Sequence, residues 1–471
     1  MDTANKKRFS PINTTSLVIV RVITVSFFLI HIATNTVGTI HAAISCNIKS
    51  YGATGNGTTK DTTAIQNAIN ACGGGGIVTF PSGKYLTAPL FLLKSNITLN
   101  ILSGATILGS ETISDYTVKS DQKVATPTLA LINSYHVTDI TITGGGVIDG
   151  QGAMWWASGK STHDRPRLVE LAYGNNIRVS NITLENAGAM HLYLKVTSNV
   201  IIDGVTIRAP SNSPNTDGIV PNSSNNVLIK NCNISVGDDN IAIKSGPTPV
   251  PSYNIQVINC KFGSGHGVSL GSDLQGGVHD VMVENSTFEG TTNGIRIKSA
   301  RTKGGKVTVI VYKNLTMTNV NYPLWFSGYY PDIPSSDSAP QPITATTPNY
   351  SNITVSNLTA TGATDNCKIV GVPEMPISAL TLDAVKITAK KGSMIRNATG
   401  LVNSSSGADS SCLIPPGPPA ALNLPTPPTP PALTPSIPST PIPTPDGVRV
   451  PSDLNPPTPN PTSSPSTVRI T

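Results

Sequence analysis

Short runs of alternating apolar and polar residues recur along much of the chain. Each run ends at one turn residue and is followed by a second short run, as in NNIRVSNITL from Asn175 and SNVIIDGVTI from Ser198. Alternation of this kind predicts β-strands, and the Asn and Gly residues between the runs predict turns. The chain is therefore predicted to consist of many short strands.

The turn residues return at a regular interval. They are Asn181, Gly204, Asn231, Asn259, Asn285, Asn314, Asn357 and Ala384, with successive differences of 23, 27, 28, 26, 29, 43 and 27. A period in the high twenties built of strands is typical of a parallel β-helix, in which each coil stacks on the last. A propeller would need four antiparallel strands per repeat, and a leucine-rich repeat would need its leucine frame. We predict an all-β fold, a right-handed parallel β-helix.

Two segments depart from this repeat. The long interval of 43 places an insertion at Tyr329–Tyr350, where PDIPSSDSAPQP is too rich in Pro and Ser for a strand, so a loop is expected. Near the start, TTAIQNAINAC after Asp61 predicts a short amphipathic helix, capped by Asp61 and ended by Gly73–Gly76. Such a helix would cover the open first coil.

The two ends of the chain differ from the repeat region. Residues 1–43 carry Lys6, Lys7 and Arg8 before an apolar stretch, which predicts a signal peptide, or a signal anchor if it is not cleaved. Residues 413–471 are rich in Pro, Thr and Ser and predict a disordered tail. Residues 44–412 would form the β-helix domain, secreted to the extracellular space or cell wall.

Cysteine usage and charge narrow the possible partners. The six cysteines lack zinc-site spacing, so disulfides are expected, preferably Cys46–Cys72 and Cys367–Cys412. The formal charge of +6 falls to +3 without the predicted leader, which supports an acidic partner weakly. There is no dense basic patch, which argues against nucleic acid. We expect a monomer without metal or cofactor, and without membrane attachment if the leader is cleaved.

Four successive coils share a polar residue, then Gly or Asn, then a branched aliphatic residue. These triplets begin at Asp217, Asp239, His266 and Asn293, at spacings of 22, 27 and 27. Because coils stack about 4.8 Å apart, the polar residues should form one column, flanked by Asp238, Arg296 and Lys298. Each motif alone fits a polar turn or a solvated strand. Together, so many like charges at this spacing would shift one another's pKa values, which favours a functional site.

In this order, the motifs NTDG, GDD, GHG and RIK resemble those of the polygalacturonases of glycoside hydrolase family 28. They stand here at Asn215–Gly218, Gly237–Asp239, Gly265–Gly267 and Arg296–Lys298, and the resemblance extends from about Tyr51 to about Asn403. It implies a hydrolase that cleaves α-1,4 bonds between galacturonate residues of polygalacturonate or pectin, with inversion at the anomeric carbon. Whether its action is endo or exo stays open.

The resemblance also implies residue roles. Asp238 is expected to be the general acid, and Asp217 and Asp239 to hold and deprotonate the attacking water, while His266 keeps the acid protonated. Arg296 and Lys298 would bind substrate carboxylates. Asn215 and Tyr330 are further expected substrate-binding residues.

Some positions depart from the family pattern. Asn240 stands where a Cys frequently follows GDD, and Phe262 stands at the position of its partner, so that disulfide is absent. The expected one-coil offset of about 4.8 Å is also shorter than the roughly 6.5–9.5 Å between the acid and base of inverting enzymes. Trp155 and Trp156 could stack on a sugar, although local packing is the favoured interpretation.

Three alternatives remain open. A rhamnogalacturonan or xylogalacturonan hydrolase would keep the fold and change the bond, and a calcium-dependent pectate lyase would share the architecture. A non-catalytic, cell-wall-binding β-helix would need only the repeat and the tail. The last alternative is disfavoured because the charged and imidazole residues of the motifs are all intact, namely Asp217, Asp238, Asp239, His266, Arg296 and Lys298.

Overall fold

The computed structural model describes residues 44–118, 128–157, 164–246, 250–403, 412 and 414–415. The predicted leader, residues 1–43, lies outside these ranges, and so does the predicted tail apart from residues 414–415. Both stay predictions, as does the domain boundary at 412.

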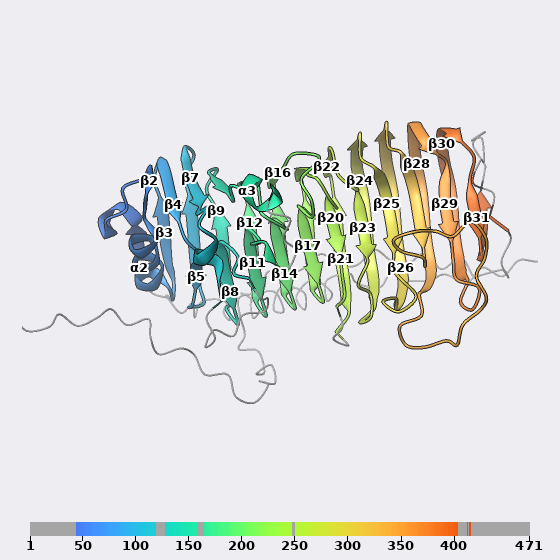
Figure 1. Ribbon diagram of the computed structural model, residues 1–471, viewed down its shortest axis with the longest axis horizontal. Helices are drawn as coiled ribbons and strands as arrows, with labels where there is room; N and C mark the ends of the chain where they lie inside the picture. The colour runs from blue at the N-terminus through green and yellow to red at the C-terminus, as the bar shows by residue number, and fades with distance from the viewer. Residues whose placement is uncertain are drawn as a thin grey trace, which may run out of the picture. The chain divides into compact units, whose positions relative to one another are not determined.

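The described body from Ile44 onward is a solenoid of parallel strands (Figure 1). The larger, 21-stranded sheet comprises two stacks that merge in the later coils. Its first stack contains β1 (Ser45–Asn47), β3 (Gly76–Phe80), β6 (Ile97–Ile101), β9 (Ile140–Thr143), β12 (Asn175–Ser180), β15 (Ser198–Asp203), β18 (Asn225–Lys230) and β21 (Ser252–Ile258). Its second stack contains β2 (Asn56–Lys60), β4 (Gly83–Thr87), β7 (Ala105–Gly109), β10 (Val147–Asp149), β13 (Thr183–Glu185), β16 (Thr206–Arg208), β19 (Asn233–Ser235) and β22 (Lys261–Phe262). The merged coils contain β24 (Val278–Glu289), β26 (Lys306–Thr318), β28 (Asn349–Asp365), β30 (Ile377–Lys391) and β32 (Ala398–Asn403).

The smaller sheet has eleven strands and is called sheet B below. Its strands are β5 (Leu90–Leu92), β8 (Ile132–Tyr135), β11 (Val169–Ala172), β14 (Leu192–Lys195), β17 (Ile219–Asn222), β20 (Ile241–Ile243), β23 (Val268–Gly271), β25 (Asn293–Lys298), β27 (Tyr322–Ser327), β29 (Cys367–Val370) and β31 (Met394–Arg396). Many strands of this sheet face the viewer in Figure 1. The parallel β-helix predicted from the coil period is confirmed.

The core consists of aliphatic side chains that stack from coil to coil. In the first stack, Ile177 pairs with Val200, which pairs with Val227, and the register continues through the later coils. These side chains are fully buried. Because alternate residues of a strand point to opposite faces, one apolar position in two is enough to fill the interior.

The predicted turn residues all adopt the left-handed conformation. Their φ values run from 48° at Asn181 to 65° at Gly204, and Ala384 is included at 53°. Asn tolerates this region better than most residues because its side chain can bond locally. The amides also bond across coils: Asn314 Nδ2 donates to Asn285 Oδ1 at 2.9 Å, and Asn357 Nδ2 donates to Asn314 Oδ1 at 2.9 Å.

Helix α2 (Thr62–Cys72) lies at the N-terminal end of the solenoid (Figure 1) and buries Ala64, Ile65, Ala68 and Ile69. The expected cap was wrong, because the Asp61 side chain makes no capping bond. It turns back instead and accepts from the backbone N–H groups of Thr54 and Gly55 at 2.7 and 2.9 Å. The other helical segments are α3 (Ala153–Ala157), η1 (Ile48–Tyr51) and η2 (Ile113–Tyr116).

Residues 328–348 form a loop between β27 and β28, as the composition predicts, whereas Asn349 and Tyr350, the last two residues of the expected insertion, belong to β28. Arg301 and Arg396 hold it to the later coils: Arg301 Nη1 donates to Ser338 Oγ at 3.0 Å, and Arg396 Nη1 lies 3.6 Å from an Asp337 carboxylate oxygen. The loop therefore has fixed contacts, although it contains no strand.

Both preferred disulfides, Cys46–Cys72 and Cys367–Cys412, are present. The broader expectation of disulfides was wrong for Cys232 and Cys260, which are buried free thiols. Each donates to the backbone carbonyl two residues earlier, Lys230 at 3.2 Å and Ile258 at 3.4 Å. Each thiol also lies 4.0 Å from a backbone carbonyl of the preceding coil, that of Ile202 for Cys232 and that of Ile229 for Cys260.

Candidate active site

The predicted column forms on sheet B. Ile219 pairs with Ile241, Ile241 with Val268, and Val268 with Ile295, so the four triplets stand in the expected register. The acidic and imidazole side chains immediately before these strands are therefore brought together at one edge of the sheet. Figure 1 shows β17, β20 and β23 side by side at this point.

Asp239 is the most enclosed carboxylate, with 1% of its surface exposed. Lys298 Nζ donates to Asp239 Oδ2 at 2.9 Å, and Arg296 Nη2 donates to Asp239 Oδ1. Burial alone would raise the pKa of Asp239, but the charges of Arg296 and Lys298 outweigh it and hold the pKa well below its ordinary value. Asp239 is therefore a fixed anion.

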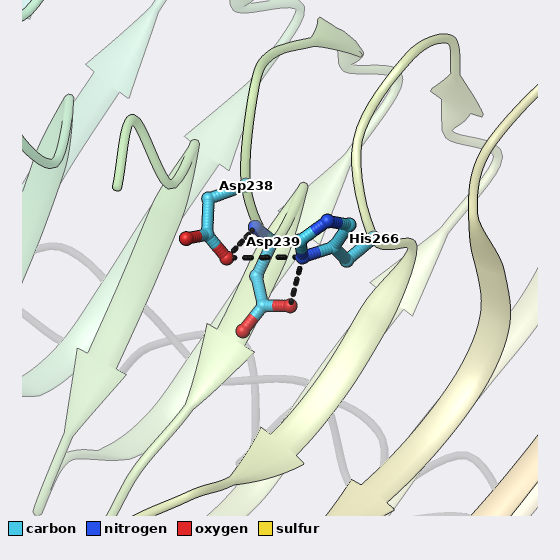
Figure 2. Close-up of side chains that lie close together, drawn as sticks. All are labelled: Asp238, Asp239 and His266. Carbon is cyan, nitrogen blue, oxygen red and sulfur yellow. Dashed lines mark hydrogen bonds and ion pairs between the residues drawn. The ribbon is translucent and has the colours of Figure 1, made fainter. Parts of the chain in front are cut away.

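The Asp238 carboxylate contacts the imidazole ring of His266. Figure 2 shows the carboxylates of Asp238 and Asp239 both close to one His266 ring nitrogen, at 3.2 and 3.9 Å from Nδ1. Burial raises the pKa of Asp238, but the hydrogen bond with His266 lowers it and the net shift is downward. Asn215 Nδ2 donates to Asp238 Oδ2 at 3.3 Å. The His266 side chain is 33% exposed, so solvent and ligands can reach this part of the site.

Asp217 lies in a different electrostatic environment. It is buried, and burial together with the negative charge of Asp238 raises its pKa to about 8. Its backbone carbonyl accepts from the N–H of His191 at 2.8 Å, and the His191 ring nitrogen Nδ1 lies 3.1 Å from the same oxygen. Near neutral pH the three acidic groups therefore comprise one protonated carboxyl and two carboxylates.

The expected substrate-binding residues surround this group. Lys298 Nζ lies 5.1 Å from the centre of the Tyr330 ring, in a cation–π contact. Tyr330 is 38% exposed and belongs to the loop after β27. All eight residues predicted for the site thus lie in one connected region of sheet B and its loops.

Four further residues of the site were not predicted from the sequence. Ser269 Oγ donates to Asp239 Oδ1 at 2.8 Å and accepts from Arg296 Nε at 2.9 Å. It pairs in register with Arg296, so extending each predicted triplet by one residue would have found it.

The other three residues of the site that were not predicted are Lys244, Arg165 and His191. The charge of Lys244 acts on both Asp217 and Asp239, and its Nζ donates to the Gly271 carbonyl at 3.2 Å. Buried Arg165 donates to the carbonyls of Gly188 and Pro214 and to Asn215 Oδ1, at 3.0, 2.6 and 2.6 Å. No motif in the sequence distinguishes Arg165 or His191 from ordinary polar residues.

Asp238, Asp239 and His266 also offer three donor atoms within 4.8 Å of one another, as a metal site would. Both Asp239 oxygens, however, already accept from cationic side chains. A divalent ion would have to compete with these fixed positive charges, so the donor set suits an uncharged or anionic ligand better.

One departure from the family pattern, Asn240, has a clear structural consequence. Asn240 is fully buried and donates to the carbonyls of Ile234 and Ser264, while its Oδ1 accepts from Gly267 N–H. These hydrogen bonds link neighbouring coils at the position of the absent disulfide.

The tryptophans follow the local-packing interpretation. Trp155 is 1% exposed, with its ring edge-on to Tyr116 at 5.2 Å, and Trp156 Nε1 donates to the Ala187 carbonyl at 3.0 Å. Trp155 is therefore enclosed by packing, and the half-buried Trp156 is held to the neighbouring coil through its ring N–H.

Comparisons with known proteins agree on one family. Residues 79–412 match the family described as glycosyl hydrolases family 28. A probable polygalacturonase of Vitis vinifera is 32% identical over 377 residues, which cover 74% of this chain and 76% of the relative. An endo-polygalacturonase of Pectobacterium carotovorum subsp. carotovorum is 31% identical over 72% of this chain and 87% of its own length.

A solved structure supports the same assignment. The polygalacturonase from Erwinia carotovora ssp. carotovora superposes with a TM-score of 0.66 at 29% identity, over 78% of this chain and 99% of that one. The match to the family covers the coils that carry the column, including all eight predicted site residues. This chain therefore belongs to glycosyl hydrolases family 28.

Proposed function

We propose that this protein hydrolyses the α-1,4-galacturonosyl bonds of polygalacturonate and pectin. The observation that carries the proposal is the group of three acidic residues, two of them buried, beside Arg296 and Lys298, within a family 28 chain. Carboxyl groups supply the acid and base that glycoside hydrolysis needs. The neighbouring cations suit a substrate that bears a carboxylate on every sugar.

In the proposed mechanism, Asp238 donates a proton to the glycosidic oxygen as its bond to the anomeric carbon breaks. Asp217 and Asp239 hold the attacking water, which gives its own proton to this pair as its oxygen bonds to the anomeric carbon. His266, at 3.2 Å from Asp238 Oδ1, governs the protonation of the acid. The proton that enters the leaving group is thus replaced by one from water, and the site returns to its starting charge.

The unliganded site holds its proton on Asp217, whose pKa is raised to about 8, whereas the pKa of Asp238 is lowered. A substrate carboxylate drawn to Arg296 and Lys298 would add negative charge beside Asp238. Nearby negative charge raises a carboxyl pKa. Substrate binding would therefore favour transfer of the proton to Asp238, where the mechanism requires it.

Inversion rests on family membership rather than on carboxyl spacing. One oxygen of Asp238 lies within 4.8 Å of one oxygen of Asp239, which is close to the separation of roughly 5–5.5 Å found in retaining enzymes. That rule describes a pair of carboxylates, whereas three acidic groups meet here. Proton NMR of the first products decides the point, since inversion releases the β-anomer and retention the α-anomer.

The test of the proposed function is product analysis on polygalacturonate. The wild-type protein should release reducing ends, and Asp238→Asn should abolish the release while circular dichroism stays unchanged. Asp280→Asn is a matched control, because Asp280 lies on β24 away from sheet B and already has the φ of 53° that Asn tolerates. Release of monomer from the outset would indicate exo action, and mixed oligomers would indicate endo action. Full activity in Asp238→Asn would remove Asp238 from the mechanism.

The same assay separates the alternatives. Products that absorb ultraviolet light would indicate a β-eliminating lyase. Cleavage of rhamnogalacturonan or xylogalacturonan without cleavage of polygalacturonate would indicate one of the related hydrolases. Binding without any cleavage would indicate a wall-binding β-helix.

We also propose that the protein acts outside the cell, as a monomer. Two disulfides in the body support an oxidising compartment. Among the residues that the structure describes, no helix has the length and apolar character needed to span a membrane. Detection of the intact protein in the medium or wall of the producing cells tests this location.

A further inference from the structure

Arg165 is a buried cation that neither gives nor takes a proton in the proposed mechanism. It is 4% exposed and belongs to the segment that precedes β11. Its Nη1 donates to the backbone carbonyls of Gly188 and Pro214 at 3.0 and 2.6 Å, and its Nη2 donates to Asn215 Oδ1 at 2.6 Å. Gly188 precedes β14, and Pro214 and Asn215 precede β17. The guanidinium therefore binds the chain where it enters three successive strands of sheet B.

The Asn215 amide connects Arg165 to the proposed general acid. Its Oδ1 accepts from Arg165, and its Nδ2 donates to Asp238 Oδ2 at 3.3 Å. A guanidinium can only donate and a carboxylate can only accept, whereas a side-chain amide has one end of each kind. The two neighbours therefore specify a single orientation of the amide. If the amide were rotated by half a turn, its oxygen would face the carboxylate and its nitrogen would face the cation, and both hydrogen bonds would be lost.

The backbone of Asn215 is held independently of this amide. Asn215 has a φ of 54°, which Asn tolerates better than most residues. The next residue, Thr216, is fully buried, and its Oγ1 accepts from the N–H of Gly237 at 3.0 Å, immediately before Asp238. The orientation of the side-chain amide is thus what remains for Arg165 to fix.

The two carboxyl oxygens of Asp238 have different surroundings. Oδ1 accepts from the backbone N–H of Asp239 at 2.8 Å and lies 3.2 Å from His266 Nδ1. Oδ2 accepts from Asn215 Nδ2 over the longer distance of 3.3 Å. Because hydrogen-bond donors favour the ionised form, the proton is placed more easily on Oδ2 than on Oδ1. As this proton leaves, negative charge develops on Asp238, and an N–H group already oriented toward it stabilises that charge.

We propose that Arg165 is a positioning residue for the general acid: it orients the Asn215 amide so that Nδ2 faces Asp238 Oδ2, the oxygen that delivers the proton. This inference rests on the proposed function. In the proton-transfer step the O–H bond of Asp238 breaks and the proton bonds to the glycosidic oxygen, which keeps the electron pair of its broken bond to the anomeric carbon. Arg165 and Asn215 exchange no proton and act only on the geometry and charge at Asp238.

A purely structural role of Arg165 predicts a different result. Loss of a tie between loops would displace the whole site and slow every substrate alike. Loss of an oriented acid slows only those substrates whose leaving group needs a proton. Fluoride leaves as an anion, so cleavage of an oligogalacturonosyl α-fluoride depends little on the general acid. The ratio of the rates for the two kinds of substrate therefore separates the two roles.

Arg165→Met is the first test, with polygalacturonate and tetragalacturonosyl α-fluoride as substrates. Turnover of polygalacturonate, measured as reducing ends, should fall about 10- to 100-fold in kcat, because general acid catalysis is impaired. Turnover of the fluoride, measured with a fluoride electrode, should fall less than about 3-fold. Equal losses on the two substrates, or wild-type kcat on polygalacturonate, would overturn the inference. If Arg165→Met does not fold, Arg165→Lys replaces it, because Lys keeps a buried cation but lacks the fork that reaches Pro214 and Asn215 together.

A double variant tests whether Arg165 acts through Asn215. Asn215→Gly removes the amide and adopts the positive φ freely, so it should show the same dependence on the leaving group. Adding the Arg165 substitution to Asn215→Gly should lower kcat by no more than about twofold further, because the amide that it would orient is already gone. Losses that multiply in the double variant would mean that Arg165 acts independently of Asn215, which contradicts the proposal.

Arg396→Met is the matched control. Arg396 Nη2 also donates to a loop carbonyl, that of Pro334, but from β31 at the C-terminal end of sheet B. This variant should keep the wild-type ratio of the two rates even where its melting temperature falls. A shift of the ratio as large as that of Arg165→Met would show that the ratio reports general loosening, against the inference.

Failure of the proposed function gives another result. In that case the wild-type protein cleaves neither substrate, which overturns both proposals. Failure of this inference alone leaves an active wild type whose Arg165 variants slow both substrates equally.

Discussion

Arg296 and Asp239 stand two coils apart in the stack of sheet B and meet in an almost fully buried ion pair. Ser269, on the strand between them, bonds to both partners. The pair thus ties three coils together at the point where the acidic side chains converge. The ion pair keeps Asp239 ionised, so the proton of the site is held by Asp217 or Asp238.

Replacing Arg296 should expose the energetic role of this pair. Arg296→Met leaves the Asp239 carboxylate buried with Lys298 as the remaining cation that donates a hydrogen bond to it, and we expect a loss of about 3–5 kcal/mol in the free energy of unfolding. Urea denaturation followed by circular dichroism measures it. Arg178→Met is the control, because Arg178 makes only an exposed pair with Asp203 at 3.9 Å and should cost less than about 1 kcal/mol. Equal losses in the two variants would show that burial of the pair has no energetic consequence.

Ser269 should act as a positioning residue. Ser269→Ala leaves Arg296 Nε without this acceptor and removes one of the two donors to Asp239 Oδ1, so kcat should fall about tenfold while the fold persists. Ser286→Ala is a matched control, since Ser286 is equally buried but bonds to Glu284 O and Cys260 N away from sheet B. The two variants should lose similar stability, and only Ser269→Ala should lose turnover. Wild-type kcat in Ser269→Ala would contradict this role.

Asp217 should make stability depend on pH. In the folded protein its pKa is raised to about 8, whereas an unfolded Asp titrates near 3.9. Between these values the folded state binds the extra proton, so this contribution to stability is full below about pH 4 and is lost as the pH rises toward 8. The slope can reach about 1.4 kcal/mol per pH unit.

Asp217→Asn removes this titration. The melting temperature of the variant relative to wild type should therefore increase from pH 4 to pH 8. Asp239→Asn should show no such change between pH 4 and pH 8. Its melting temperature relative to wild type should rise only as the pH falls below about 4, because the lowered pKa of Asp239 contributes stability that is present above pH 4 and lost as the pH falls further. A pH-independent difference between Asp217→Asn and wild type would mean that Asp217 is ionised in the folded protein.

At the asparagine turns, the effect of the left-handed backbone on stability can be separated from the effect of the side-chain hydrogen bonds. Asn314 has a φ of 54° and bonds to Asn285 and Asn357. Asn314→Gly loses the side-chain bonds but adopts this φ freely, whereas Asn314→Ala loses the bonds and also meets a left-handed penalty of about 1–2 kcal/mol. Asn314→Ala should therefore be the less stable variant by chemical denaturation. A more stable Ala variant would show that the turn geometry relaxes on substitution.

The sequence was most informative where the structure repeats. Turn residues such as Asn231 and Asn259 must return at each coil because the strands between them are held in register, so their spacing revealed the fold and the column. Asp217, Asp239 and His266 could be aligned for the same reason.

Contacts that cross between coils were not predictable in this way. Arg165 reaches Asn215 from a loop 50 residues earlier, and nothing in its local sequence marks it as different from a surface arginine. The position of the Asp61 carboxylate likewise depends on a loop that precedes it, not on the helix that follows. Side chains that bond to distant backbone carry no periodic signal.

The insertion after β27 lengthens one coil to 43 residues, yet Asn357 still bonds to Asn314 at 2.9 Å across that coil. The path of the chain outside the sheets can thus grow without displacing the strands beneath it. Loops of this kind can be exchanged or extended to change which polymers gain access to sheet B, while the acidic residues keep their positions. In this architecture, selectivity can diverge without loss of the reaction chemistry.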